Sequence, residues 1–335
     1  PPMEIWGGCP FGLEDVRLPH SYLSKTQSAH RFNAPDIFTT DLPVTKICRW
    51  FDYGCLMSEV LYEVDGYIAT ITLNAPERMN TISGAMLNEL SDHLLRGDRD
   101  RNVRCIVVTG AGKAFCAGLD LASQMGKKEN LGVLDAGSDM GAEFDLRTAP
   151  PVVLHNLDTP TICSINGGAA GYGLDLAFGC DIRIASTTAK LAPGFAKRGI
   201  LPESGGTWLL PRMVGYAKAA EICFTGRTLS AAEGLELGLV NHIVAPEELH
   251  AKTYGLADEI ASNAPLAVRA IKRMMRAAET ETFEQNIHHV FLQLLPLFKT
   301  QDFKEGVACF FWYRNANIKR REVVIHTTNY ARQGI

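Results

Sequence analysis

A chain of 335 residues with 46% apolar and 21% charged residues holds enough apolar material for one large core or two smaller ones, so a disordered protein is excluded. The formal net charge of -4 provides no general attraction to nucleic acid or anionic membranes. We therefore expect a small-molecule partner and neither a nucleic-acid nor a membrane partner. No apolar run approaches the roughly 20 residues that cross a bilayer, and no signal peptide is recognisable, which favours a cytoplasmic or organelle-matrix location.

The cysteine and histidine patterns do not indicate a metal site. The nine cysteines include no CxxC pair, and the nine histidines do not cluster. Free, largely buried thiols in a reducing compartment are expected, and no metal ligands are assigned.

Residues 1–56 are rich in proline, glycine and aromatic residues without a sustained period, which indicates an irregular extension. A regular fold is expected from residue 57. Its first two β-rich runs flank Asp65 and Gly66, a dipeptide suited to a type I′ hairpin turn.

The next segments alternate between helix and strand patterns. Apolar residues recur at helical spacing over 86–95, with Ser83 as a predicted N-cap, and buried strands are predicted at 103–109 and 161–165. Each of these strands leads into a glycine-rich turn, GAGKAFCAGLD or NGGAAGYGLD, and each turn is expected to enter a helix, the second over 171–178. This order predicts an α/β core with right-handed crossovers. Residues 126–146 are predicted to form a loop near a site, and the chain from 204 onward is mainly helical, with a strand pattern at 239–244.

The two glycine-rich turns lack the common nucleotide and nucleophile signatures. A GxGxxG fingerprint starting at Gly171 fails because its last position is Leu176, and neither GxxxxGK[ST] nor GxSxG occurs. Ala117 and Tyr172 lie beside the glycines of the two turns. If the sheet brings the turns together, these two backbone amides would form an oxyanion hole; the alternative is that the glycines only permit close packing.

Six segments in order carry a family resemblance: NAPERMNTIS, CIVVTGAGKAFCAGLDL, GGAAGYGLDLAFGCDIRIAS, PESGGTWLLPRMVG, FTGRTLSAAEGLELGLVNHIV and EGVACFFWYRNANIK. They resemble the crotonase superfamily of enoyl-CoA hydratases and isomerases over residues 57–319. The resemblance implies an α/β fold with a crotonase-like ββα spiral core at 57–255, a helical oligomerisation region at 256–319 and a tail at 320–335. It also implies an acyl-CoA thioester substrate, assembly as a homotrimer or dimer of trimers, and a thioester oxygen held by the amides of Ala117 and Tyr172.

The acids distinguish the members of this family. Hydratases carry two glutamates, and the matching positions here are Asp175 and Phe195, so the second acid is missing. Isomerases of the family carry an acid eight residues further on, and that position is Glu203. A single base can move a proton between two carbons, whereas addition of water usually uses two carboxylates. The resemblance therefore favours double-bond isomerisation with Glu203 as the proton shuttle and Asp175 assisting. Hydration by Asp175 and Glu203 remains the alternative.

The resemblance also suggests substrate-binding positions. It points to Arg78, Met79 and Asn80 as the stretch that lines coenzyme A. At or near the two turns and the acyl chain, the positions are Lys113, Gly118, Asp120, Gly171 and Phe195. Near the C-terminus, they are the aromatic residues Phe310 and Tyr313. Tyr313 stands where the family often has a phosphate-binding lysine, which puts that contact in doubt.

No cofactor beyond the coenzyme A of the substrate is implied. Thioester hydrolysis and C–C bond cleavage are other reactions of the family. A non-catalytic scaffold or RNA-binding homologue is the alternative of a different class, although the overall charge does not favour it.

Overall fold

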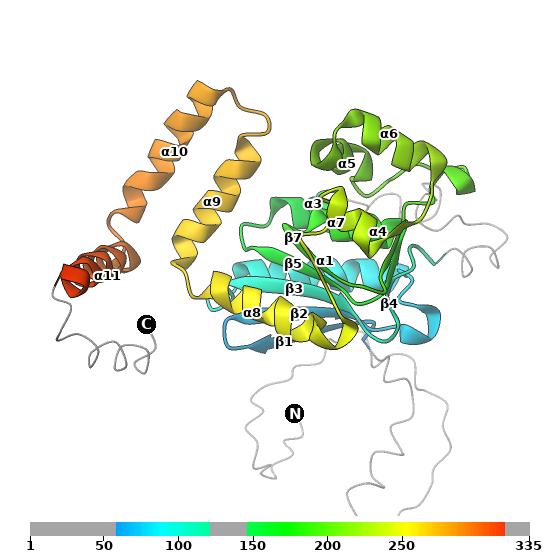
Figure 1. Cartoon of the computed structure of the whole chain (residues 1–335), viewed down its shortest axis with the longest axis horizontal. Helices are drawn as coiled ribbons and strands as arrows, with labels where there is room; N and C mark the ends of the chain where they lie inside the picture. Colours follow the sequence, from blue (N-terminus) through cyan, green and yellow to red (C-terminus); the bar gives the residue numbers. More distant parts are fainter. Residues whose placement is uncertain (1–57, 121–145, 319–335) are drawn as a thin grey trace, which may run out of the picture. The chain divides into compact units, whose positions relative to one another are not determined.

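The computed structural model describes the backbone of residues 58–120 and 146–318, and the side chains of 58–120 and 147–311 (Figure 1). The described residues belong to one compact unit that spans Met57–Ile335. The expected extension at 1–56, nearly all of the loop at 126–146, the helix after the first glycine turn and the tail at 320–335 lie outside the described residues. Helix α8 (Leu249–Ala261) runs without a break through position 255, where the expected core ends and the expected helical region begins.

The larger sheet has six strands in the order β1-β2-β3-β5-β7-β10. The first two pair antiparallel, and every other neighbouring pair is parallel. The strands are β1 (Val60–Asp65), β2 (Ile68–Leu73), β3 (Cys105–Gly110), β5 (Thr161–Ile165), β7 (Ile182–Ser186) and β10 (His242–Val244). The buried runs of β3 and β5 are typical of parallel strands with both faces covered, so the prediction of an α/β core is confirmed.

The hairpin between β1 and β2 is confirmed, but its turn differs from the prediction. Asp65 pairs with Ile68, so the two central residues are Gly66 and Tyr67. Of these two, only Gly66 has a positive φ, at 55°. A type I′ turn needs positive φ at both central positions, so the type I′ prediction was wrong, and the single positive φ at the first position fits type II′.

A second sheet has four strands in the order β4-β6-β8-β9. They are β4 (Ala114–Cys116), β6 (Gly168–Ala170), β8 (Lys190–Ala192) and β9 (Leu229–Ser230). The first three follow β3, β5 and β7 closely in the chain, so each long strand continues into a short strand of the other sheet. This repeat of long strand, short strand and helix is the ββα arrangement that the resemblance implied.

Helix α1 (Gly84–Arg99) begins and buries its apolar face as predicted. The Ser83 hydroxyl accepts a hydrogen bond from the Met86 N–H at 3.1 Å, which satisfies one free amide of the first turn. Met86, Leu90 and Leu94 recur at helical spacing and are fully buried. Each such side chain contributes about 1.5–3 kcal/mol by leaving water.

The remaining helices follow the predicted pattern, apart from α3, which the sequence analysis did not predict. They are α3 (Pro150–Asn156), α4 (Tyr172–Gly179), α5 (Gly206–Val214), α6 (Tyr216–Thr225), α7 (Ala231–Glu236), α9 (Pro265–Ala277), α10 (Phe283–Leu297) and α11 (Gln301–Ile318). In Figure 1, α3 to α7 lie over one side of the larger sheet and α8 over the other, while α9 and α10 form a hairpin. Within the parts of the chain that the structure describes, no helix is long and apolar enough to cross a membrane.

Helix α9 attaches to the core mainly through charge. Of its thirteen residues only Met274 is buried. Lys272 pairs with Asp181 at 2.6 Å, and Arg276 pairs with Asp158 at 3.1 Å. Because Asp158 follows α3, the Arg276 pair connects α9 to the helix that forms one wall of the site described next.

Candidate active site

The two glycine turns lie side by side. Strands β4 and β6, which precede the turns, pair in parallel. A Cβ atom on Gly118 would lie 3.0 Å from the Ala170 carbonyl oxygen and 3.8 Å from the Tyr172 nitrogen. Gly118 also has a φ of 102°, which side chains rarely adopt. Glycine at this position therefore permits both the positive φ and the close contact of the first turn with the second.

Close packing also fixes the start of α4. A Cβ atom on Gly173 would lie 2.5 Å from both the Cβ atom and the carbonyl oxygen of Cys116. Gly171 precedes the helix with a φ of 50°, and its N–H donates to the Ala192 carbonyl oxygen at 2.9 Å. The N-terminus of α4 is thus held between β4 and β8.

The two amides expected in an oxyanion hole are in different states. Tyr172 is the first residue of α4, so its N–H has no acceptor within the helix. The Ala117 N–H instead donates to the Met79 carbonyl oxygen at 3.0 Å. The oxyanion hole expected from these two amides stays a prediction, and in the structure the Ala117 amide is bonded to Met79, whose backbone is left-handed with a φ of 54°. A ligand oxygen would have to share or displace this bond.

Asp175 and Glu203 line one pocket of about 330 Å³ between α3, α4 and the start of α5. Asp175 is 2% exposed, and its Oδ2 accepts hydrogen bonds from the N–H groups of Gly206 (3.2 Å) and Ser204 (3.4 Å). A Cβ atom on Gly206 would collide with this carboxylate, so glycine at that position lets the helix start approach the acid.

Burial changes the proton affinity of both acids. It raises the pKa of Asp175 from 3.8 to about 7, with a smaller rise from the charge of Glu203, against the lowering effect of the Gly206 and Ser204 hydrogen bonds. Glu203 is exposed, but the surrounding protein still removes enough water from its carboxyl to raise its pKa as well. Both acids can therefore exchange protons closer to neutral pH than an exposed carboxylate.

The rest of the pocket wall is mainly apolar and aromatic. His155 of α3 and Trp208 of α5 meet edge to face, with ring centroids 5.3 Å apart. Burial, and then the charge of Arg276, lowers the pKa of His155, so its ring is neutral at pH 7. His155 was missed because the sequence analysis did not predict α3, whereas Trp208 lies in a segment that was predicted as helical but was given no role at the site. The paired prolines at the first two positions of α3, Pro150 and Pro151, were the available signal.

Phe195 lies where hydratases carry an acid. It is 5% exposed, and its ring is 3.8 Å from the position of a Cβ on Gly171. An apolar ring therefore borders the second glycine turn.

The residues expected to bind coenzyme A have other contacts. The Arg78 guanidinium is paired with Glu59 at 2.5 Å and with Asp120 at 3.4 Å, so both side chains are engaged within the protein. Asn80 is fully buried: its Oδ1 accepts from Ala75 N–H, and its Nδ2 donates to carbonyl oxygens of the β3–β4 segment at 2.8–3.2 Å. These bonds use the Asn80 side chain to hold the fold, and the assignment of Asn80 to coenzyme A binding stays a prediction.

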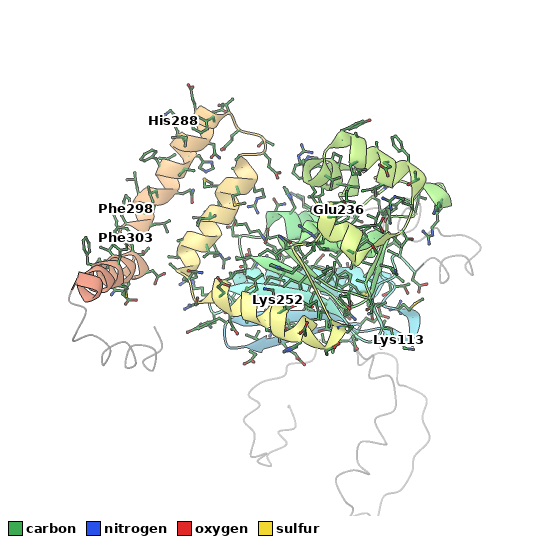
Figure 2. The ribbon with its side chains drawn as sticks, viewed as in Figure 1. Lys113, Glu236, Lys252, His288, Phe298 and Phe303 are labelled. Atoms are coloured by element: carbon green, nitrogen blue, oxygen red, sulfur yellow. The ribbon has the colours of Figure 1, made fainter. Side chains whose placement is uncertain are left out.

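Three further positions remain apart from the acids. Met79 is 58% exposed, and Lys113 is exposed just before β4 (Figure 2). Phe310 lines an apolar groove between α9, α10 and α11, not the pocket with the acids. The Tyr313 side chain lies outside the described residues. No group of three or more side chains that could hold a metal ion occurs in the described ranges.

The family model for enoyl-CoA hydratase/isomerase matches residues 63–321. The chain belongs to the enoyl-CoA hydratase/isomerase family. It is 36% identical over 264 residues to the 1,2-epoxyphenylacetyl-CoA isomerase of Escherichia coli, covering 78% of this chain and 98% of that protein. It is also 36% identical over 253 residues to the (E)-benzylidenesuccinyl-CoA hydratase of Thauera aromatica, covering 75% and 95%.

Solved structures agree with this membership. The enoyl-CoA hydratase of Bacillus anthracis matches with a TM-score of 0.69 and 33% identity, covering 76% of this chain and 96% of that one. The mixed α/β architecture is thus that of the crotonase superfamily, and the chain is an enzyme of the hydratase/isomerase kind. Because the relatives include both an isomerase and a hydratase, membership alone does not choose between the two reactions.

Proposed function

We propose that this enzyme isomerises the double bond of an enoyl-CoA thioester, with Glu203 as the proton shuttle. The observation that carries the proposal is the placement of the two acids: Glu203 and buried Asp175 share a pocket, while Phe195 replaces the second acid at the glycine turn. Coenzyme A arrives as part of the substrate, and no other cofactor takes part in the proposed reaction.

In the proposed reaction, the thioester oxygen accepts a hydrogen bond from the Tyr172 N–H and a second from Ala117, whose N–H would leave or share Met79. The Glu203 carboxylate removes a proton from the carbon between the thioester and the 3,4 double bond. The electron pair moves into a dienolate whose negative oxygen lies at the two amides. Glu203, now protonated, returns the proton two carbons further along, which gives the 2-enoyl thioester. Each oxyanion donor contributes about 3 kcal/mol to such a step.

The electrostatics of the pocket support this role for Glu203. A base that must take and return the same proton works best when its pKa lies near the working pH, and partial burial moves the pKa of Glu203 in that direction. Asp175, with a pKa of about 7, is about half protonated at neutral pH, so it carries less negative charge than an exposed carboxylate and could assist protonation.

Glu203→Gln tests the proposal. The change keeps the side-chain shape and removes the base, so isomerisation of a 3-enoyl-CoA should fall by about a hundredfold or more, the scale of general acid–base catalysis. Glu236→Gln, at an exposed position on α7 outside the pocket lining, is the matched control and should retain full activity (Figure 2). A folded Glu203→Gln protein with unchanged turnover would refute the assignment.

Hydration of a 2-enoyl-CoA is the second candidate. It is favoured by one observation: Asp175 and Glu203 both line the same pocket, so together they could position and split a water molecule.

The helical C-terminal region is proposed to pair with further copies of this chain, as a homotrimer or dimer of trimers. An apolar groove of about 570 Å³ lies between α9, α10 and α11. On α10, Phe291, Leu292 and Leu295 are each more than half exposed, at 57%, 66% and 55%. Exposed apolar surface of this extent on the described helices favours contact with another protein, and a second copy of this chain would cover it.

A further inference from the structure

One buried hydroxyl group in the pocket with the acids lacks a hydrogen-bond partner among the described residues. Among the described side chains, the unpaired buried hydroxyls are those of Tyr62, Ser91, Tyr172 and Ser204. Ser204 lines the pocket with the acids, and it is 3% exposed. Because an unpaired buried hydroxyl destabilises a fold, its presence beside a reaction site calls for an explanation.

Helix capping does not explain Ser204. Serine just before a helix commonly caps it, but the N-cap of α5 is Gly205, at a φ of 98°, and no side chain caps that helix. The Ser204 backbone is fixed instead, because its N–H and that of Gly206 both donate to Asp175. The backbone therefore holds the hydroxyl in position, although the hydroxyl forms no hydrogen bond with the described residues.

The neighbouring Asp175 offers a second donor. With a pKa of about 7, a substantial fraction of this carboxyl is protonated at neutral pH and can donate its O–H. A Ser204 O–H and an Asp175 O–H in one apolar pocket match a ligand that accepts hydrogen bonds. A plain hydrocarbon chain offers no acceptor, so it would displace water from both donors without replacing the hydrogen bonds.

We propose that Ser204 and Asp175 form a polar subsite of the acyl pocket that binds an oxygen atom on the acyl group. This inference rests on the proposed function. The preferred substrates are then enoyl-CoA thioesters whose acyl chain carries a hydroxyl or carbonyl oxygen beyond the double bond.

The test compares kcat/KM for 3-octenoyl-CoA with that for analogues of equal length carrying one hydroxyl or oxo group beyond the double bond. The unchanged enzyme should prefer at least one oxygenated analogue by about threefold to tenfold, the effect of one neutral hydrogen bond. Ser204→Ala should remove this preference, so that the ratio of kcat/KM for the oxygenated analogue to kcat/KM for 3-octenoyl-CoA falls to about one. Ser91→Ala, which deletes another unpaired buried hydroxyl on α1, is the matched control and should retain the preference.

Three outcomes would overturn the subsite: no preference for any oxygenated analogue, a preference that survives Ser204→Ala, or an equal loss on all substrates. An equal loss would indicate that the hydroxyl holds water or structure. Calorimetric binding of the saturated octanoyl thioester and its oxygenated analogues to both variants gives the same comparison without turnover. If no thioester is isomerised but the binding preference depends on Ser204, the proposed reaction fails and the subsite stands.

Discussion

Asp175→Asn should stabilise the protein, and the gain should depend on pH. Burial raises the pKa of Asp175 from 3.8 to about 7, so ionising this group in the folded state is harder than in the unfolded chain. A carboxyl with a raised pKa in the folded state leaves stability untouched below pH 4. It then destabilises the fold increasingly as the pH rises to about 7 and by a constant amount above that. A shift of about three pH units corresponds to about 4 kcal/mol in the free energy of unfolding.

Asparagine keeps the shape of the side chain, and its oxygen can still accept the two backbone hydrogen bonds while no charge is buried. Urea unfolding of both proteins from pH 4 to pH 8.5 measures the difference. The advantage of Asp175→Asn should grow by several kcal/mol between pH 4 and pH 7 and then level off. A difference that stays constant across this range would refute the reasoning, because it would show that Asp175 titrates alike in the folded and unfolded states.

The remaining predictions concern the turn, the α9 contact and the C-terminal helices. Gly173→Ala should abolish isomerisation and lower the free energy of unfolding by several kcal/mol in thermal unfolding, because the new Cβ would lie 2.5 Å from Cys116 atoms. A fully stable and active variant would contradict the packing described. Asp158→Ala removes the partner of two arginines on α9 and should speed proteolysis within 265–318 ahead of the core, with equal cleavage rates as the contrary result. Phe291→Ser with Leu292→Ser should lower the mass measured by sedimentation, and an unchanged assembly would exclude that face as the contact between copies.

Local patterns predicted the elements whose signals lie within their own residues. Helix α1 is an example, since its Ser83 cap and apolar spacing are both read directly from the chain and both are found in the structure. The three-residue strands β4, β6 and β8 are too short to show a period, so the second sheet was not predicted as strands. The family resemblance supplied the ββα arrangement that periodicity could not.

Features that depend on distant partners could not be predicted. The hydrogen bond from the Ala117 N–H to the Met79 carbonyl oxygen joins residues 38 positions apart, and the Met79 backbone is left-handed. The burial of Asn80 depends on carbonyl groups of the β3–β4 segment. The sequence analysis anticipated Asp175 and Glu203 only as two acids from one stretch. Their shared pocket also needs α3, which was not predicted although the Pro150–Pro151 pair marks its first turn.

The central claim is that this enzyme moves a proton within its substrate and does not add water. The direct measurement is mass spectrometry of the products after incubation with 2-enoyl-CoA and 3-enoyl-CoA thioesters in water enriched in heavy oxygen. We predict that a 3-enoyl-CoA becomes a 2-enoyl-CoA of unchanged mass without heavy oxygen, and that this conversion is lost in Glu203→Gln. Rapid formation of a 3-hydroxyacyl-CoA that carries the heavy oxygen, with no isomerised product, would contradict it and assign Asp175 and Glu203 to hydration.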